Sequence, residues 1–358
     1  MAKLGDICFL KAGKGMTAAQ ISPEYSDAKY PCYGGNGIRG YVDKYTHDGE
    51  YVLIGRQGAL CGNVQIASGK FYATEHAVVA TPLVDLDTKW LYNALLAANL
   101  NQYSTGAAQP GLNIDILSKV DIQVPDLPTQ RRIATTLNKV SEGIVVCRQM
   151  LADLDAMVKA RFVEMFSTCT NIRTVNDICS IITDGTHQPP RFQQEGIPFI
   201  FVSNIVGNKV TYEAEKFISQ ETYDELIKRT PIEIGDVLLS TVGSYGHPAV
   251  VTEDTKFLFQ RHIAYLKPKH ELIDSFYLHS ALLSPDVQKQ IEGKVKGIAQ
   301  KTLNLSEIRS ITIPVPEMIQ QTAFAAFVNQ IDKSKVIVQQ QLAELETLKK
   351  SLMQEYFG

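Results

Sequence analysis

The chain repeats itself, and this repeat limits the folds that it can adopt. Residues 106–113 read GAAQPGLN, and 191 residues later residues 297–304 read GIAQKTLN. In the same register Gln130 recurs as Gln321. Upstream, the matches are weaker and the offset is shorter, which indicates insertions between the copies. The chain is therefore a duplicated unit whose two copies have diverged most in their middle parts.

Length and charge narrow the possibilities further. The 358 residues are 45% hydrophobic and 20% charged, as in an ordinary globular protein. At about 100–200 residues per domain, this length suits two domains. Lys and Arg number 35 and Asp and Glu 38, which gives a formal net charge of −3. Coating of nucleic acid by bulk positive charge is excluded, so any DNA binding must come from local basic surface.

Cysteine usage and the N-terminal sequence indicate the compartment. The six cysteines form no CxxC pair and have no histidine cluster beside them. This pattern favours buried thiols in a reducing cytoplasm over disulfides or zinc. The first residues, MAKLGDICFLKAGKG, lack the apolar core of a signal peptide, and no run approaches the ~18 apolar residues of a membrane span. We expect a soluble, cytoplasmic protein without a membrane partner.

The first part of each copy is rich in short β-like runs separated by Gly, Pro, Asn and Asp. Strands are expected at residues 50–54, 199–202, 236–240, 249–252 and 262–266. Helices are expected at residues 87–100 and 275–283. The predicted fold class is α+β, with globular domains at residues 1–128 and 169–319.

The second part of each copy is a long helix, expected at residues 129–168 and 320–358. Its apolar residues recur at alternating spacings of four and three, the heptad pattern of a coiled coil. In the first copy, where Arg161 interrupts it, this seam comprises Ile133, Leu137, Val140, Ile144, Cys147, Leu151, Leu154, Val158 and Met165. In the second copy, where Lys335 and Lys349 interrupt it, the seam comprises Phe324, Val328, Ile331, Val338, Leu342, Leu345, Leu352 and Tyr356.

Each helix has an apolar stripe that its own domain need not cover, so the two helices can cover each other. The duplication predicts a pseudo-two-fold arrangement in which they pair as an antiparallel coiled coil. The alternative is that each helix docks on its own domain. Pro128 and Pro316 mark the helix starts, and Thr129 is a candidate N-cap for the first helix.

The chain carries no catalytic motif that we can defend. A literal GxGxxG at residues 35–40 follows no buried strand and precedes no amphipathic helix, so we reject it as a nucleotide site. The sequence contains neither a phosphate-binding GxxxxGK[ST] loop nor the Asp/Asn-Pro-Pro-Tyr tetrapeptide of adenine methyltransferases. His76 and His262 fall at equivalent places in the repeat and are expected to be structural. The sequence therefore argues against an enzyme.

Basic and amide side chains instead gather on the expected loops. Arg and Lys can contact phosphates or guanine, and Gln suits adenine. The DNA-contact candidates are Lys14, Arg39, Arg56, Gln57 and Gln109 in the first copy, and Thr186, His187, Arg191, Lys294, Lys296, Gln300 and Lys301 in the second. Gln109 and Gln300 share one position of the repeated GxAQ loop, which suits a common docking role. For each residue, a solvated surface position is the alternative.

Together these features resemble the specificity (S) subunit of type I restriction–modification systems over essentially the whole chain. The segments VPDLPTQ, which ends at Gln130, and VPEMIQQ, which ends at Gln321, resemble the entries into the family's conserved helices. PCYGGNGI at residues 31–38 and DGTH at residues 184–187 resemble motifs of its target-recognition domains. The order and the duplication of these motifs make the resemblance specific.

The resemblance implies target-recognition domains at residues 1–128 and 169–319, with a central conserved helix at 129–168 and a distal one at 320–358. Each domain would read one half of a bipartite, asymmetric target in double-stranded DNA. The helices would set the unread spacer and dock two modification (methyltransferase) subunits. Those partners would hold S-adenosylmethionine and methylate adenine N6, and restriction subunits would add translocation and cleavage with ATP and Mg. The chain itself would hold no cofactor and would not be an enzyme.

Two alternatives stay open from the sequence. A coiled-coil scaffold with two protein-binding domains predicts no salt-sensitive affinity for duplex DNA. An independent methyltransferase predicts saturable binding of S-adenosylmethionine by the isolated chain.

Overall fold

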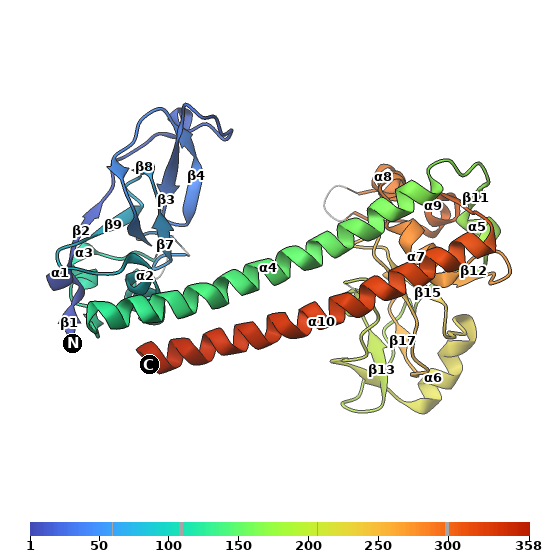
Figure 1. The fold of residues 1–358 in the computed structure, drawn as a ribbon. Coiled ribbons are helices and arrows are strands. Elements are labelled where there is room, and N and C mark those ends of the chain that lie inside the picture. Colours follow the sequence, from blue (N-terminus) through green and yellow to red (C-terminus); the bar gives the residue numbers. More distant parts are fainter. Residues whose placement is uncertain (59, 107–109, 206, 298–300) are drawn as a thin grey trace. The chain divides into compact units, whose positions relative to one another are not determined.

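The computed structural model describes residues 1–58, 60–106, 110–205, 207–297 and 301–358. They form two compact units: unit 1 is Met1–Arg148 with Gln340–Gly358, and unit 2 is Gln149–Gln339. Two 40-residue helices, α4 (Leu127–Phe166) and α10 (Met318–Phe357), contribute to both units. Figure 1 shows that each unit carries its own sheets and shorter helices.

Unit 1 contains a four-stranded antiparallel sheet in the order β2-β9-β6-β7. These strands are Cys8–Ala12, Ala77–Pro82, Tyr51–Gly55 and Val64–Ala67. A second sheet, in which β3 and β8 are parallel, has the order β4-β3-β8-β5, comprising Gly37–Val42, Tyr30–Gly34, Lys70–Ala73 and His47–Asp48. The short pair β1-β10 and the helices α1, α2 and α3 complete the unit, at Ala2–Lys3, Asp121–Ile122, Leu4–Ile7, Thr88–Ala97 and Ile114–Leu117.

Unit 2 repeats this plan. Its antiparallel sheet has the order β12-β18-β15-β16, comprising Cys179–Asp184, Ile263–Pro268, Val237–Ser240 and Pro248–Val250. The second sheet, in which β13 and β17 are parallel, has the order β14-β13-β17, comprising Phe217–Ile218, Ile197–Ile200 and Leu258–Phe259. The pair β11-β19 and the helices α5, α7 and α9 match β1-β10, α1, α2 and α3, at Ile172–Thr174, Thr312–Pro314, Val175–Ile178, Ser275–Leu282 and Leu305–Arg309. Helices α6 (Gln220–Leu226) and α8 (Pro285–Lys294) are additions of unit 2.

The predicted α+β duplication is confirmed, and two equivalent glycines show how closely the copies agree. Gly13 follows β2 and Gly185 follows β12, and each donates its N–H to the neighbouring strand, β9 or β18. A Cβ on Gly13 would lie 2.1 Å from the carbonyl oxygen of Ala73, and one on Gly185 would lie 2.2 Å from that of Phe259. Both copies therefore need glycine where two backbones approach each other.

The five expected strands match observed ones to within two residues at each end, and the one expected at residues 199–202 is shifted toward the N-terminus. Strand β13 stops at Ile200, and Val202–Asn204 form a 3-10 turn. The side-chain carbonyl of Asn204 accepts a hydrogen bond from the N–H of Phe201 at 2.9 Å, so a local side chain replaces the strand partner there. The GxGxxG segment forms the turn between β3 and β4 and the start of β4, so a strand, not a helix, follows it.

The long helices enter the cores of both units. In unit 1, Ile133 and Leu137 of α4 are buried with Trp90 of α2, and Leu352 and Tyr356 of α10 pack against the same cluster. In unit 2, aromatic side chains dominate the junction. The centroid distances are 5.5 Å for Phe162 and Phe324, and 5.0 Å for Phe166 and Tyr277. The helices thus dock on the globular parts and also meet each other.

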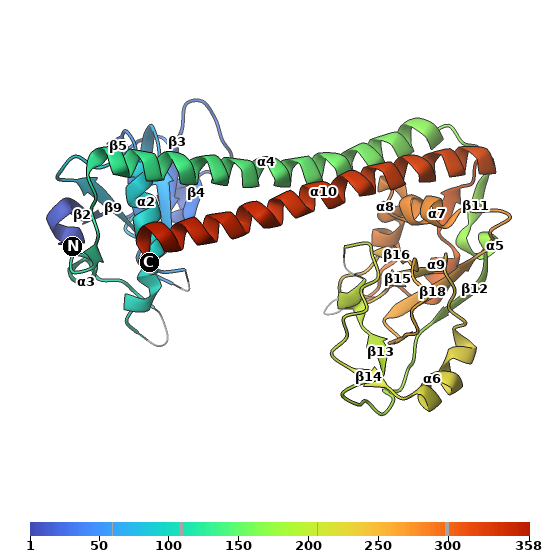
Figure 2. The same ribbon diagram turned by 60° about the horizontal axis from the view of Figure 1, so that its bottom comes forward.

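Within unit 2, α4 and α10 run antiparallel, which confirms this part of the predicted fold (Figures 1 and 2). Asp155 pairs with Lys335 at 2.7 Å, and further along α4 Phe162 meets the earlier residue Phe324 of α10. In unit 1, Arg148 pairs with Glu346 at 2.8 Å. The expected seam residues Ile133, Leu137, Val140, Ile144, Val328, Ile331 and Val338 are buried, and Leu151, Leu154, Leu342, Leu345 and Leu352 are half-buried.

The start of α4 differs from the prediction. Helix α4 begins at Leu127, before Thr129, and the N–H of Thr129 donates to the Asp126 carboxylate at 2.8 Å. The prediction that Thr129 caps the helix is therefore wrong, and Asp126 takes that role. Lys335, which interrupts the apolar seam as predicted, pairs with Asp155 across the helix pair.

Among the described residues, no helix is long and apolar enough to span a membrane.

Candidate nucleic-acid interface

Three loops of unit 1 are held together by backbone hydrogen bonds. The N–H of Arg56 donates to the carbonyl of His76 at 3.0 Å, and the carbonyl of Arg56 accepts from Leu112 at 2.8 Å. The N–H of Gly58 donates to the carbonyl of Pro110 at 3.0 Å. The loop after β6, the turn before β9 and the loop before α3 therefore form one rigid surface.

Unit 2 builds the same arrangement from different side chains. Thr241 stands in the place of Arg56: its N–H donates to the carbonyl of His262 at 2.9 Å, and its carbonyl accepts from Leu303 at 2.8 Å. The N–H of Gly243 reaches the carbonyl of Lys301 at 3.4 Å. The two units thus share a backbone frame on which the presented side chains differ.

The residues that flank the repeated GxAQ segment pair with each other next to this frame. In unit 1 its ends are closed by two hydrogen bonds of 2.9 Å between Thr105 and Gly111. In unit 2 the matching pair is Lys296 and Thr302, at 3.0 and 2.8 Å. The candidates Gln109 and Gln300 lie outside the described residues.

The frame of unit 1 borders a hollow of about 300 Å³. Arg39, Gln57 and His76 line it, with the turn of the β3–β4 hairpin. Arg39 and Gln57 are exposed. Arg56 is half-buried beside Gln57, and Lys14 is exposed at the end of β2. The structure therefore brings Arg39 and Gln57 to one hollow, and Lys14 does not line it.

Unit 2 has a hollow of about 580 Å³ that contains the predicted Thr186, His187 and Arg191. A neighbouring hollow of about 480 Å³ is lined by Arg261, His262 and Thr302, among others. Asp184 borders both, so these hollows are parts of one surface.

The predicted lysines of unit 2 lie beside this surface and differ in their contacts. Lys296 pairs with Glu307 at 2.9 Å, and Lys294 lies 4.0 Å from the same carboxylate and donates to Ser310 at 2.8 Å. The Lys296 ion pair lowers the pKa of Glu307 below its usual range. Lys301 is exposed. Lys294 and Lys296 would have to exchange Glu307 for a phosphate in order to contact DNA.

Sequence reasoning missed several residues of these hollows. His76 and His262, expected to be structural, are partly exposed and line the hollows of their units. Burial, together with the neighbouring Arg261, lowers the pKa of His262, so its ring is neutral at pH 7. The equivalent positions of the two histidines in the repeat were the sequence signal that could have placed them at the candidate interface. Arg229, which lines the larger hollow, carried no signal in the sequence.

The repeat places a buried cysteine at the same position of each unit. Burial raises the pKa of Cys8 and of its repeat partner Cys179 to about 12, so neither thiol ionises at neutral pH. Across the described part of the chain, no three His, Cys, Asp or Glu side chains gather where they could share a metal ion.

The fold is that of S subunits. The crystal structure of the type I restriction–modification S subunit from M. genitalium matches with a TM-score of 0.66 at 17% identity, covering 99% of this chain and 95% of that one. A second structure, described as the basis of complex assembly and conformational transition of the type I restriction–modification system, matches with a TM-score of 0.56 at 15% identity, covering 99% of this chain and 96% of that one.

The sequence matches the family described as "Type I restriction modification DNA specificity domain" over residues 1–152 and 170–347, and the chain belongs to this family. The EcoprrI specificity subunit of Escherichia coli is 49% identical over 137 residues, which are 38% of this chain. The MjaVIII specificity subunit of Methanocaldococcus jannaschii is 19% identical over 397 residues, covering 99% of this chain and 90% of that protein. The matches cover only 34% of the EcoprrI subunit and 37% of the EcoBI subunit of Escherichia coli.

Proposed function

We propose that this chain is the DNA-reading subunit of a type I restriction–modification complex, in which each unit reads one half of a bipartite target in double-stranded DNA. The observation that carries the proposal is the repeated frame of three pinned loops, at Arg56 in unit 1 and at Thr241 in unit 2. A shared backbone frame supports docking on DNA in the same manner. Different side chains on it support the reading of different bases.

Equivalent positions of the two frames differ in charge and shape. Gln57 corresponds to Val242, and Glu75 corresponds to Arg261, one residue before the equivalent histidines. At the first position unit 1 presents an amide where unit 2 has an apolar side chain, and at the second unit 1 presents a carboxylate where unit 2 has a guanidinium. These side chains favour different base edges. The proposed target is therefore asymmetric.

The partners and cofactors follow from the proposed role. Two modification subunits would dock on the helices, hold S-adenosylmethionine and methylate adenine N6, and restriction subunits would supply ATP- and Mg-dependent translocation and cleavage. The chain itself would be cytoplasmic, would hold no cofactor and would catalyse no reaction. Exposed apolar side chains on α4, among them Val145, Val146, Met150 and Met157, support a protein partner on this helix.

The test is DNA binding by the complex of this chain with its modification subunits, measured over a range of salt concentrations. Arg39→Ala in unit 1 and Arg191→Ala in unit 2 are each expected to weaken binding, with effects that map to different halves of the target. Lys119→Ala, at an exposed position outside the hollow of unit 1, is the charge-matched control. Binding that is insensitive to salt and to both arginine variants would contradict the proposal.

The proposed role of the helices as a spacer has its own test. Seven residues added to each helix lengthen it by about 10 Å, which corresponds to roughly 3 bp of DNA. We expect the unread gap in the target to grow by this amount while both half-sites stay the same. Changed half-sites with an unchanged gap would contradict the spacer role.

A further inference from the structure

The segment between β14 and β15 distinguishes unit 2 from unit 1. In unit 2 it contains α6 and the 3-10 turn Ile227–Arg229, whereas the matching stretch of unit 1, between β4 and β6, contains only the short strand β5. The last residue of this turn, Arg229, lines the hollow of about 580 Å³. Unit 2 therefore presents the Arg229 guanidinium from an added segment.

A carboxylate holds this guanidinium in place. Nη2 of Arg229 lies 2.6 Å from Oδ1 of Asp184, and Nε2 of His187 lies 2.8 Å from Oδ2 of the same carboxylate. The Asp184 side chain is 16% exposed, whereas that of Arg229 is 54% exposed. One end of the guanidinium is thus fixed by a shielded partner while the rest faces the hollow. In unit 1 the residue before the equivalent glycine is Ala12, so this anchor is also specific to unit 2.

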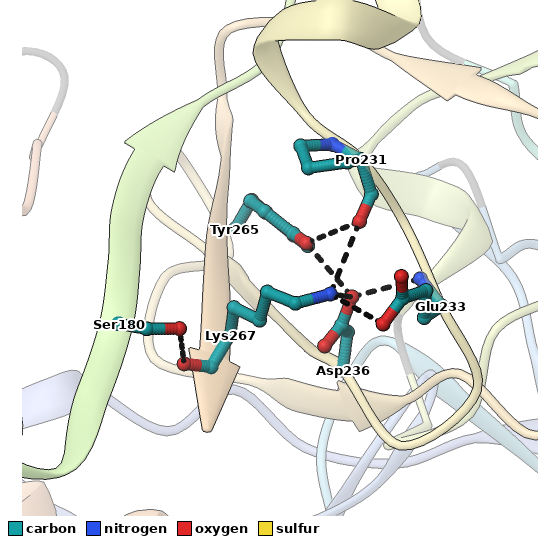
Figure 3. A network of polar contacts seen from close by, with 6 residues as sticks. All are labelled: Ser180, Pro231, Glu233, Asp236, Tyr265 and Lys267. Atoms are coloured by element: carbon teal, nitrogen blue, oxygen red, sulfur yellow. Dashed lines mark hydrogen bonds and ion pairs between the residues drawn. The ribbon is translucent and has the colours of Figure 1, made fainter. Parts of the chain in front are cut away.

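A network of polar contacts fixes the backbone just after Arg229 (Figure 3). The carbonyl of Pro231 accepts from the Tyr265 hydroxyl at 2.7 Å and lies 3.4 Å from Nζ of Lys267. The buried Asp236 carboxylate accepts from the N–H of Glu233 and from the Tyr265 hydroxyl, both at 2.8 Å. Tyr265 and Lys267 belong to β18 of the four-stranded sheet of unit 2, the central sheet, so the segment that carries Arg229 is tied to this sheet.

The charge around Arg229 favours a base edge over a phosphate. Asp184 already compensates the charge of the Arg229 guanidinium, and the same hollow contains Arg191 and Lys228, cations that can take the phosphate contacts instead. Guanine presents two neutral acceptors, O6 and N7, which suit the parallel N–H groups of an anchored arginine. A carboxylate that orients the guanidinium also lowers the entropy lost on binding.

We infer that Arg229 is a specificity-determining residue of unit 2, which reads a guanine in the major groove while Asp184 orients it. The inference rests on the proposed function, because it requires that unit 2 meets DNA. The Tyr265–Asp236–Lys267 network is a positioning element in this account. It acts on the bases only through the loop that it anchors.

The experiment uses the complex with the modification subunits and a duplex that contains the target mapped for the unaltered protein. A panel of duplexes changes one base pair at a time in both halves, and relative affinity is measured for each. Arg229→Ala is expected to remove the preference at a single G·C pair of one half, a loss of roughly 5- to 150-fold in discrimination. Arg229→Lys, which keeps the charge but not the paired N–H groups, is expected to lose the same preference.

Lys228→Ala is the matched control, because Lys228 is the adjacent cation of the same hollow. It is expected to leave the order of base preferences unchanged. An Arg229→Ala protein that binds all duplexes more weakly by one common factor, with a shallower salt dependence, would identify a phosphate contact and overturn the inference. An Arg229→Ala protein with unaltered preferences would also overturn it. If the unaltered complex itself prefers no sequence, the proposed function fails as well, and the two failures are thereby distinguished.

Discussion

The side-chain carbonyl of Gln321 accepts a hydrogen bond from the backbone N–H of Asp274 at 2.9 Å. Asp274 in turn caps α7, because its carboxylate accepts from the N–H groups of Phe276 and Tyr277. The amide nitrogen of Gln321 donates to the carbonyl of Pro316 at 2.8 Å. One buried glutamine thus joins the start of α10 to the start of α7.

Unit 1 contains the same junction, in which Gln130 accepts from Asp87 at 3.0 Å and donates to Pro125 at 2.8 Å. Gln321→Ala would leave the N–H of Asp274 buried without its partner, at a cost of about 1–3 kcal/mol. We expect the thermal transition to shift down by about 2–12 °C. Gln320→Ala, at the exposed neighbour, should shift it little. Equal shifts for the two variants would show that the junction adds no stability.

Gly185 lies where no side chain fits, beside the proposed reading surface. In Gly185→Ala the new Cβ would meet the carbonyl oxygen of Phe259, so the strand end that carries Asp184 must move, and we expect a cost of about 1–3 kcal/mol. DNA affinity should fall together with stability. Gly293→Ala is the control, because nothing lies within 4 Å of that position in α8, and it should raise stability by about 0.5–1 kcal/mol. Thermal unfolding and DNA titration of both variants test this prediction. Equal stabilities and equal DNA affinities for Gly185→Ala and Gly293→Ala would contradict it.

If unit 2 binds DNA as proposed, Glu307 competes with the phosphates for Lys294 and Lys296. Glu307→Gln frees both lysines, so the affinity of the complex for duplex DNA should rise at low salt and depend more steeply on salt. The pKa of Glu307 is lowered by Lys296, so the stabilising effect of this pair is present at neutral pH and is lost as the pH falls through the lowered pKa. Glu292→Gln removes the same charge from an exposed site on α8. Identical DNA affinities for the two variants would show that the lysines do not contact DNA.

We expect His279 of α7 to make unit 2 sensitive to acid. Burial lowers its pKa to about 4, against the attraction of Asp332 and together with the repulsion of Lys335, both on α10. Between pH 6.5 and 4 the unfolded chain therefore binds a proton that the folded chain does not, and stability falls as the pH falls. At pH 5 the loss is at most about 2 kcal/mol. Burial also lowers the pKa of His47 and His262, which acts in the same direction.

The contribution of His279 can be measured by comparing the free energy of unfolding in urea at pH 7 and at pH 5. His279→Gln should have a smaller difference between the two pH values than the unaltered chain, whatever its stability at pH 7. A difference of the same size in both proteins would show that His279 does not account for the acid sensitivity.

The long helices and the duplication could be predicted because both follow from regular spacings in the sequence. The heptad seams of α4 and α10 can be recognised because Ile133, Leu137 and the later apolar residues recur at fixed spacings. The duplication can be recognised because the motifs of the second copy follow in the same order as those of the first. The start of α4 was misplaced because Asp126 and Thr129 are both good capping residues, and only the backbone conformation decides between them.

The parts of the candidate site that escaped prediction depend on contacts between distant segments. Arg229 and Asp184 are 45 residues apart, and only the packing of the inserted segment onto the central sheet brings them to 2.6 Å. Likewise, the pairing of Lys296 with Glu307 follows from the fold of the loop before α9. Loops tolerate many side chains, so composition alone does not reveal which of them converge.

We propose that this chain directs a partner methyltransferase to a bipartite DNA sequence. The most direct measurement is modification-sensitive sequencing of the genome of a methylation-free host that expresses the modification subunit, with and without this chain. We expect a new N6-methyladenine motif, with two short halves and a fixed gap, only when the chain is present. Methylation of the same sites without this chain would contradict it.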